Sequence, residues 1–248
     1  MKAMKAAFFF MVGLCALNSL AETNESVLRR TGGIIIPKDN GKRLTIVNSC
    51  GASTNAVMQL VKGSENLFHI PVRNLAVQPS DATPYKAAKS YQNNETPAII
   101  YIYSGEKDGP TLSVHVDDAI TTINVTPLKS ITAEIEADRL GKELYRAYGL
   151  ILGAYYSAKM PSVLSPAYSV GQLDNIRIKM FSPMHISSIM HTSRMLDLPI
   201  LRPTTYAAAC RMGWAPPPTN DIQRAIWNET RQIPTNPIKI EFDPAKGK

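Results

Sequence analysis

The sequence predicts a mixed α/β fold in which a mostly parallel sheet is followed by a smaller helical part. Segments with strand-like and helix-like patterns alternate through the first half of the chain, an order that favours a parallel sheet. The segment 98–103 is a near-continuous apolar run, which is typical of a strand buried on both faces. A long amphipathic helix pattern then begins near residue 132.

The first ordered strand is expected at 44–47, where Leu-Thr-Ile-Val precedes the turn-like Asn-Ser-Cys-Gly. A helix capped by Ser53 or Thr54 should follow, because apolar residues then recur at helical spacing. A second strand is expected at 69–77. A short helix is expected at 85–91, entered through the preceding proline.

Three strands are then expected in succession. The apolar run at 98–103 is suited to the middle of the sheet, and residues 105–110 form a turn. Apolar and polar residues alternate over 112–116, so this strand has one wet face and should lie near an edge. Residues 120–125 complete the set.

The long helix should begin at about Thr132 and end near Gly153. Glu134 and Glu136 lie in its first turns, where the helix dipole favours acids. Its apolar stripe consists of Leu140, Leu144, Ala147, Tyr148 and Ile151. Further helices are expected at 184–196, 204–212 and 221–227, with loops that contain proline and glycine between them. We therefore expect an α/β subdomain at 43–157 and a helical, loop-rich C-terminal subdomain at 158–248.

The N-terminus reads as a secretory signal peptide over residues 1–21. Two lysines precede an apolar stretch that is too short to span a membrane, and Ser19-Leu20-Ala21 offers a cleavage site. Lipidation at Cys15 is the alternative to cleavage after Ala21. Residues 22–42 form a polar, flexible lead-in that could contain an early strand at 34–36. We expect a secreted or periplasmic protein without a transmembrane segment.

Charge and cysteine content narrow the function classes. The net charge of +7 is dispersed and does not interleave with aromatic residues, so nucleic acid is not an expected partner. After the signal, only Cys50 and Cys210 remain. They could form one long-range disulfide in an oxidising compartment or stay as two buried thiols, and the sequence leaves both alternatives open.

The most informative motif lies on the long helix. Lys142-Glu143-x-x-Arg146-x-x-Gly149-x-x-Leu152 matches the zinc-protease pattern H-E-x-x-H-x-x-G-x-x-H only at its Glu and Gly. Lys and Arg carry positive charge and only donate hydrogen bonds, and Leu offers no lone pair. None of the three can replace a neutral imidazole on zinc, so we expect neither metal nor cofactor here.

With this element order, the chain resembles the metzincin zinc proteases over roughly residues 43–200. Within them it is most similar to the archaemetzincins, which carry a second, structural zinc on cysteines in C-V-M and F-C-x-x-C signatures. Ser162-Val163-Leu164 stands where C-V-M would fall, and 181–185 (Phe-Ser-Pro-Met-His) stands in place of F-C-x-x-C. Gly153 takes the first cysteine position. The resemblance therefore implies a scaffold without either metal, where only His185 keeps a metal-ligand side chain.

The charged motif residues have two interpretations. Lys142 and Arg146 are one helical turn apart and could together bind an anion or a carboxylate in a former substrate cleft. Ordinary exposed helix charge is the favoured alternative. Glu143 could act as an acid or base, but an ion pair with Arg139 or Arg146 on a solvated helix face is favoured, because no zinc-bound water is available to it.

Other candidate side chains have weaker signals. His115, His185 and His191 are expected in surface or capping roles, and the last two should lie on different sides of one helix. Several tyrosines could line a ligand groove, although packing at a helix interface is favoured for Tyr145, Tyr148, Tyr155, Tyr156 and Tyr168.

Three functions remain after these exclusions. The leading hypothesis is a non-catalytic pseudo-protease that binds a peptide or protein partner in the former substrate groove, where an edge strand can pair with an extended peptide. The second is an enzyme of non-metallic chemistry that uses Glu143. The third is a structural module of the cell envelope.

Overall fold

The computed structural model describes residues 30–158, 162–177 and 179–232. The predicted signal peptide at 1–21 lies outside these residues. The chain divides into two compact units, Lys38–Arg202 and Met1–Pro37 with Pro203–Lys248. These limits do not coincide with the boundaries expected at 42/43 and 157/158, since residues 158–202 belong to the same unit as the sheet.

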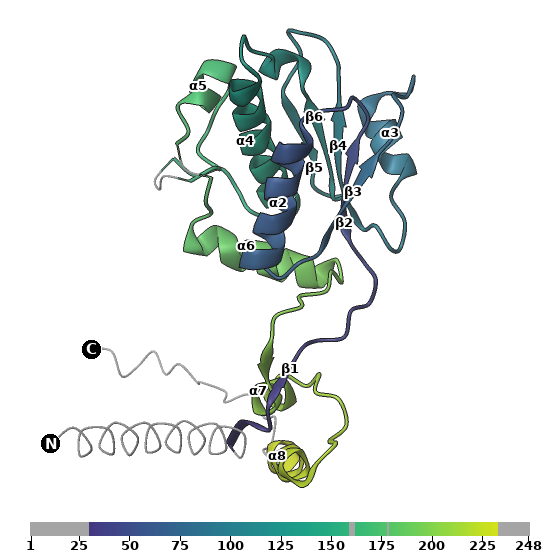
Figure 1. Cartoon of the computed structure of the whole chain (residues 1–248), viewed down its shortest axis with the longest axis vertical. Coiled ribbons are helices and arrows are strands. Elements are labelled where there is room, and N and C mark those ends of the chain that lie inside the picture. The colour runs from purple at the N-terminus through teal and green to yellow at the C-terminus, as the bar shows by residue number, and fades with distance from the viewer. Residues whose placement is uncertain (1–29, 159–161, 178, 233–248) are drawn as a thin grey trace, which may run out of the picture. The chain divides into compact units, whose positions relative to one another are not determined.

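The larger unit contains a five-stranded sheet in the order β3-β2-β4-β6-β5 (Figure 1). Its strands β2, β3, β4 and β6 are parallel, and β5 is antiparallel to β6. This arrangement confirms the mostly parallel sheet and places the alternating segment at an edge. The strands are β2 (Leu44–Asn48), β3 (Val72–Ala76), β4 (Ala98–Tyr103), β5 (Leu112–His115) and β6 (Ile120–Asn124).

Both faces of the central strands are buried because helices cover the sheet on either side. Helices α2 (Thr54–Leu67) and α4 (Ala133–Ile151) pack on one face, and α3 (Pro84–Ser90) packs on the other (Figure 1). Alternate residues of β4 accordingly enter different cores: Ile100 joins the core under α2 and α4, and Tyr101 the one under α3. This explains why the sequence of β4 is apolar at every position.

Helix α4 has nearly the predicted limits. The side chain of Thr132 caps it by accepting from the N–H of Ile135, and Glu134 and Glu136 lie in its first turn. After the last turn, Gly153 has a φ of +80°, a conformation that glycine adopts without strain. The predicted apolar stripe is buried, and Tyr148 at its centre lies 2.8 Å from the hydroxyl of Ser64 on α2.

The chain after α4 is loop-rich within the larger unit, where η1 (Thr126–Leu128) precedes α4, and α5 (Val170–Asp174) and α6 (Pro183–Met195) follow it. The smaller unit pairs β1 (Ile34–Ile35) with β7 (Thr204–Thr205) and contains α7 (Tyr206–Arg211) and α8 (Asp221–Gln232). Its core is small and is formed by Tyr206, Ala207 and Ile226. Helix α8 extends beyond the predicted end at residue 227.

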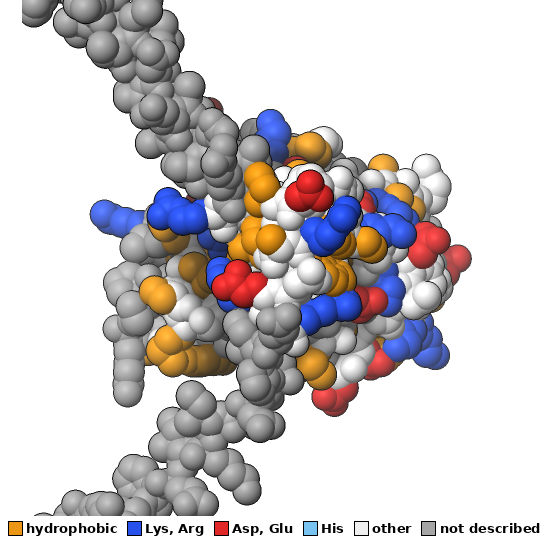
Figure 2. Space-filling view, turned by 90° about the horizontal axis from the view of Figure 1, so that it is seen from below, with side chains coloured by type: hydrophobic (Ala, Val, Ile, Leu, Met, Phe, Trp, Pro, Cys, Tyr) orange, Lys and Arg blue, Asp and Glu red, His pale blue; other side chains and the backbone are white. Residues whose placement is uncertain are grey.

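The surface charge, the state of the cysteines and the helix lengths can be compared with the expectations from the sequence. Acidic and basic side chains are interspersed over the face drawn in Figure 2. Cys50 and Cys210 are free thiols in the structure, one in each unit. None of the helices in the described part of the chain is both long and apolar enough to cross a membrane.

Candidate functional site

The three charged motif residues are buried, which corrects the expectation of exposed helix charge. Lys142, Glu143 and Arg146 are 5%, 2% and 2% exposed. Thr111, just before β5, and the loop 162–168 contact Glu143 and Arg146, and α5 contacts Lys142; local sequence patterns place none of these segments there. Leu152, at the last motif position, is fully buried at the C-cap of α4.

Glu143 is held at both carboxylate oxygens. The hydroxyl of Thr111 donates to Oε1 over 2.9 Å, and Nε of Arg146 donates to Oε2 over 3.1 Å. The predicted ion pair with Arg146 is therefore present, but in a buried setting rather than on a solvated face. Burial raises the pKa of Glu143, while the charge of Arg146 and the hydrogen bond from Thr111 act to lower it.

Arg146 ties helix α4 to the loop that follows it. Its Nη1 donates to the carbonyl oxygen of Ser165 over 2.8 Å, and its Nη2 reaches the carbonyl oxygen of Ala167 at 3.4 Å. The guanidinium also lies 5.1 Å from the ring centroid of Tyr156. These contacts and the pair with Glu143 use the planar, multi-donor geometry that distinguishes Arg from Lys. Together they connect β5, α4 and the loop 162–168 through one buried network.

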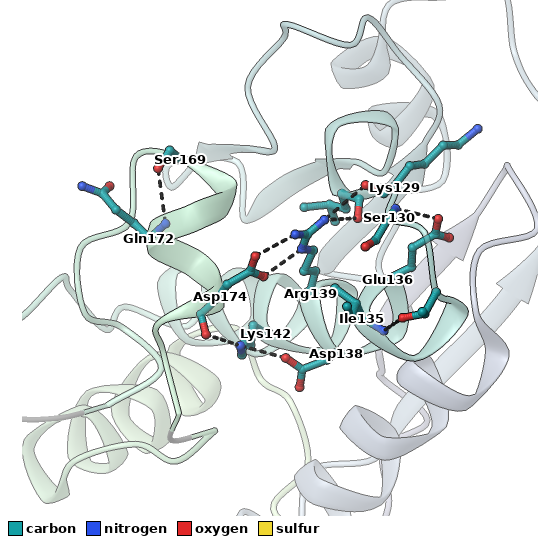
Figure 3. A network of polar contacts seen from close by, with 12 residues as sticks. Lys129, Ser130, Ile135, Glu136, Asp138, Arg139, Lys142, Ser169, Gln172 and Asp174 are labelled. Carbon is teal, nitrogen blue, oxygen red and sulfur yellow. Dashed lines mark hydrogen bonds and ion pairs between the residues drawn. The ribbon is translucent and has the colours of Figure 1, made fainter.

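Lys142 takes part in a separate network (Figure 3). Its Nζ lies 2.8 Å from a carboxylate oxygen of Asp138 and 3.3 Å from the carbonyl oxygen of Asp174 on α5. Arg139 makes a two-pronged pair with Asp174 over 2.6 and 2.8 Å, and Lys179 also pairs with Asp138. Each motif cation thus has its own carboxylate, Asp138 for Lys142 and Glu143 for Arg146. Lys142 and Arg146 therefore do not point together at one anion site in this structure.

The packing beneath α4 explains the glycine of the motif. A Cβ at Gly149 would lie 2.7 Å from a ring carbon of Phe181 and 3.2 Å from Cδ1 of Leu164. Leu164 is fully buried there and follows Ser162, whose hydroxyl accepts from the N–H of Leu164 over 3.1 Å. The segment 162–164 therefore lies directly under the motif helix.

The histidines do not assemble a metal centre. His185 is 1% exposed in the first turn of α6, beside the ring of Tyr155, and its Nδ1 has no hydrogen-bond partner. His191 is exposed, so the two lie on different sides of α6 as predicted. His115 is exposed on β5 and lies 4.5 Å, between ring centroids, from Tyr85. Among the described residues, no group of three His, Cys, Asp or Glu side chains could hold a metal ion.

A cavity of about 250 Å³ lies beside β5. It brings together three of the residues considered from the sequence, Arg146, Tyr156 and Tyr168. Tyr148, by contrast, is a core residue and Tyr145 is half-buried. Sequence reasoning missed the rest of the lining, because nothing local indicates that the turn before β5 meets the loop after α4. The lining residues are Pro110, Thr111, Leu112, Arg146, Tyr156, Pro166, Ala167 and Tyr168.

The architecture matches that of a solved archaemetzincin structure. The crystal structure of archaemetzincin from Methanopyrus kandleri superimposes with a TM-score of 0.52 over 63% of this chain and 98% of that one, at 12% sequence identity. The fold is archaemetzincin-like. Archaemetzincin from Archaeoglobus fulgidus in complex with malonate and a zinc-dependent peptidase from Methanocorpusculum labreanum also match. Both give a TM-score of 0.45, with 16% and 10% identity over 58% and 59% of this chain and 98% and 99% of theirs.

Sequence comparison gives no further information, since neither a family model nor a curated protein matches the chain. At these identities, the likeness establishes the archaemetzincin-like fold alone. The assignment of Lys142, Arg146 and Leu152 to lost zinc-ligand positions stays a prediction from the sequence. The donor chemistry is independent of that assignment: two cations and a leucine on this face of α4 do not fit a zinc ion.

Proposed function

We propose that this protein is a secreted or periplasmic pseudo-protease that binds an extended peptide, without catalysis, alongside the edge strand β5. The observation that carries the proposal is the buried Glu143–Arg146 pair beside that strand. Both oxygens of this acid already accept a hydrogen bond, one from Thr111 and one from Arg146, and among the described residues no group of metal-ligating side chains supplies an activated water. Pairing of a peptide with the edge of β5 needs no metal, because main-chain hydrogen bonds supply the contacts.

The free edge of β5 supports binding by strand addition. Within the described part of the chain, β5 pairs only with β6. The N–H of Asn124 donates to the carbonyl of Thr111, and antiparallel pairs alternate between bonded and non-bonded. Thr111 and Ser113 therefore direct their main-chain groups toward β6, while Leu112 and Val114 direct theirs outward. An added strand would pair with these two residues.

The test is binding of acetylated hexapeptide amide pools, measured by fluorescence polarisation. Wild type should bind a subset of pools, also in the presence of a chelator. Val114→Pro removes an outward N–H that a bound peptide needs but the sheet does not, so binding should be lost. Because the Val114 side chain also packs against the core, the matched control is Val114→Ala, which loses the same packing but keeps the N–H and should still bind. Equal binding by Val114→Pro would exclude strand addition at β5.

Two controls separate the other functions. Ser113→Pro removes an inward N–H and should lower stability, which checks the assignment of the two edges. Hydrolysis of the pools by wild type that is lost in Glu143→Gln would favour an enzyme of non-metallic chemistry. Absence of binding by every pool would favour a structural envelope module.

A further inference from the structure

Two further cavities lie at the carboxyl end of the parallel strands and share no lining residue with the cavity beside β5. One of about 300 Å³ lies on the side of α2 and α4, and one of about 270 Å³ lies on the side of α3. Cys50, which follows β2, and Ser104, which follows β4, line both, so the two cavities meet at these residues. Together they have the volume of a small-molecule site, roughly 300–1,000 Å³.

The strand order explains why a crevice forms here. In the sheet, β3 lies on one side of β2 and β4 lies on the other. The chain leaves β2 through α2 toward β3, and it leaves β4 toward β5 and β6 in the opposite direction. Connections that diverge in this way leave a crevice at the carboxyl ends of the two strands, which is where open α/β sheets bind their ligands. Cys50 and Ser104 lie at this point.

Two buried asparagines fix the loops around the crevice. Asn48 ends β2, and its side-chain amide both accepts from the N–H of Ala52 and donates to the carbonyl oxygen of Ala52, each over 3.0 Å. Asn124 ends β6, and its amide accepts from the N–H of Gly105 and donates to the carbonyl oxygen of Glu106, each over 2.8 Å. The loops after β2 and β4 are therefore held in place before a ligand arrives, which lowers the entropic cost of binding.

The cavity on the side of α3 suits a planar, uncharged group. None of its lining residues is charged, and its walls include Pro79, Pro84 and the rings of Tyr101 and Tyr103. The centroids of the two rings are 6.3 Å apart and their planes differ by 24°. Flat aromatic surfaces of this kind favour stacking with another ring.

The cavity on the side of α4 adds charge. Its charged lining residues are Lys129 and Glu136. Glu136 accepts from the N–H of Ser130 over 2.8 Å, and its charge is attracted to nearby Arg139, whereas exposed Lys129 forms no ion pair with any described residue. Burial raises the pKa of the Cys50 thiol, and the charge of Lys129 acts in the opposite direction, so this charge reaches the shared part of the crevice. The charge left for a ligand to neutralise is therefore positive.

We infer that this crevice binds a small organic anion that carries a planar ring. The ring lies against Tyr103 in the cavity beside α3, and the acidic group lies toward Lys129 and the hydroxyl of Ser104. Nucleotides and aromatic carboxylates share this chemistry. The site is separate from the edge of β5, so the inference does not depend on peptide binding there.

The test is isothermal titration calorimetry of the full chain with two matched pairs, adenosine 5′-monophosphate against adenosine and indole-3-acetate against indole-3-acetamide. At least one anion should bind, and its uncharged counterpart should bind roughly tenfold more weakly, the usual effect of losing one charge-assisted hydrogen bond. The pair that responds distinguishes a phosphate ligand from a carboxylate ligand. Binding of neither anion, or equal binding of anion and counterpart in both pairs, would overturn the inference.

Two variants and a matched control examine the residues. Lys129→Ala should weaken the bound anion roughly tenfold, whereas Lys62→Ala removes the same charge from an exposed position of α2 outside both linings and should change nothing. Ser104→Trp fills the shared part of the crevice from an exposed position and should abolish binding without unfolding the protein. Equal weakening by the two lysine variants, or full binding by Ser104→Trp, would contradict the assignment of the site.

Alkylation by iodoacetamide locates the ligand independently. Mass spectrometry of peptides follows the labelling of each cysteine at about pH 8.5, near the ordinary thiol pKa. A saturating anion should slow the labelling of Cys50 and leave that of Cys210 unchanged, because Cys210 is a half-buried free thiol in the other unit. Unchanged labelling of Cys50 at saturation would place the ligand elsewhere and overturn the inference.

Discussion

At the residue scale, Glu143 and Arg146 form a buried ion pair, so removal of one side chain leaves the charge of the other buried without a partner. Arg146→Met should lower the free energy of unfolding by about 3–5 kcal/mol near neutral pH, the usual consequence of breaking a buried pair from one side. Chemical denaturation measures this directly. Arg146→Met/Glu143→Gln should recover most of the loss, because no unpaired charge remains.

The pH dependence of Arg146→Met has a definite sign. Burial already raises the pKa of Glu143, and losing Arg146 removes the largest effect that lowers it. Above pH 4.5, the ordinary pKa of a glutamate carboxyl, the folded variant then binds more protons at this group than the unfolded chain does. Stability of Arg146→Met should therefore fall as pH rises from that value. A flat profile, or the same slope in the double variant, would contradict this account of Glu143.

The stability contributed by His185 should change with pH in the opposite direction. Burial lowers its pKa below 6.5, and the first turn of a helix also disfavours a cation. The unfolded chain thus takes up a proton that the folded protein resists, so the stability contributed by neutral His185 is present above pH 6.5 and is lost as pH falls below it. His185→Leu should reduce the pH dependence of the thermal unfolding midpoint over about pH 5–7. An unchanged slope would assign the effect to other groups.

The sequence identified the charged motif residues as notable, but it did not predict which groups surround them in the fold. Lys142, Glu143 and Arg146 stand out by their spacing on a helix, whereas their burial depends on contacts with residues 17 to 32 positions away along the chain. The partners Thr111, Ser165 and Ala167 carry no local signal, because a hydroxyl and two carbonyl groups are available almost anywhere. The burial and the hydrogen-bond partners of these three residues therefore depend on long-range packing, which the chemistry of the single residues does not predict.

At the element scale, two glycines of α4 provide a matched comparison. A Cβ at Gly149 would lie 2.7 Å from the Phe181 ring, while a Cβ at Gly141 meets only the flexible Nζ of Lys179 at 3.3 Å. Gly141→Ala should raise stability by up to about 1 kcal/mol, because alanine favours the helix. Gly149→Ala has the same gain but should be net destabilising by about 1–3 kcal/mol, because it overpacks the core.

Thermal or chemical unfolding of both variants checks this prediction. Equal effects would mean that segment 162–164 and Phe181 do not pack against α4 as described. The limits of α4 were predictable because its cap, its acidic first turn and its terminal glycine are all local signals. The loop 162–168 was not, since its conformation depends on carbonyl groups that accept from Arg146 on another element.

At the scale of the whole molecule, the order of elements predicted the sheet well. Parallel strands separated by helices leave few topologies, and the alternating pattern of β5 correctly indicated an edge. The division into Lys38–Arg202 and a smaller unit from both chain ends was not predictable, because the two-residue strands β1 and β7 come from distant segments. Short pairings of this kind leave almost no pattern in the sequence.

A buried Glu143–Arg146 ion pair holds this site together on the archaemetzincin-like fold, and the side chains at the motif positions predict that no zinc binds there. Zinc content of the purified full chain after dialysis, measured by elemental analysis, tests it most directly. We predict far less than one zinc per chain, because Lys142, Arg146 and Leu152 supply no ligand. One zinc per chain that survives dialysis would contradict the account.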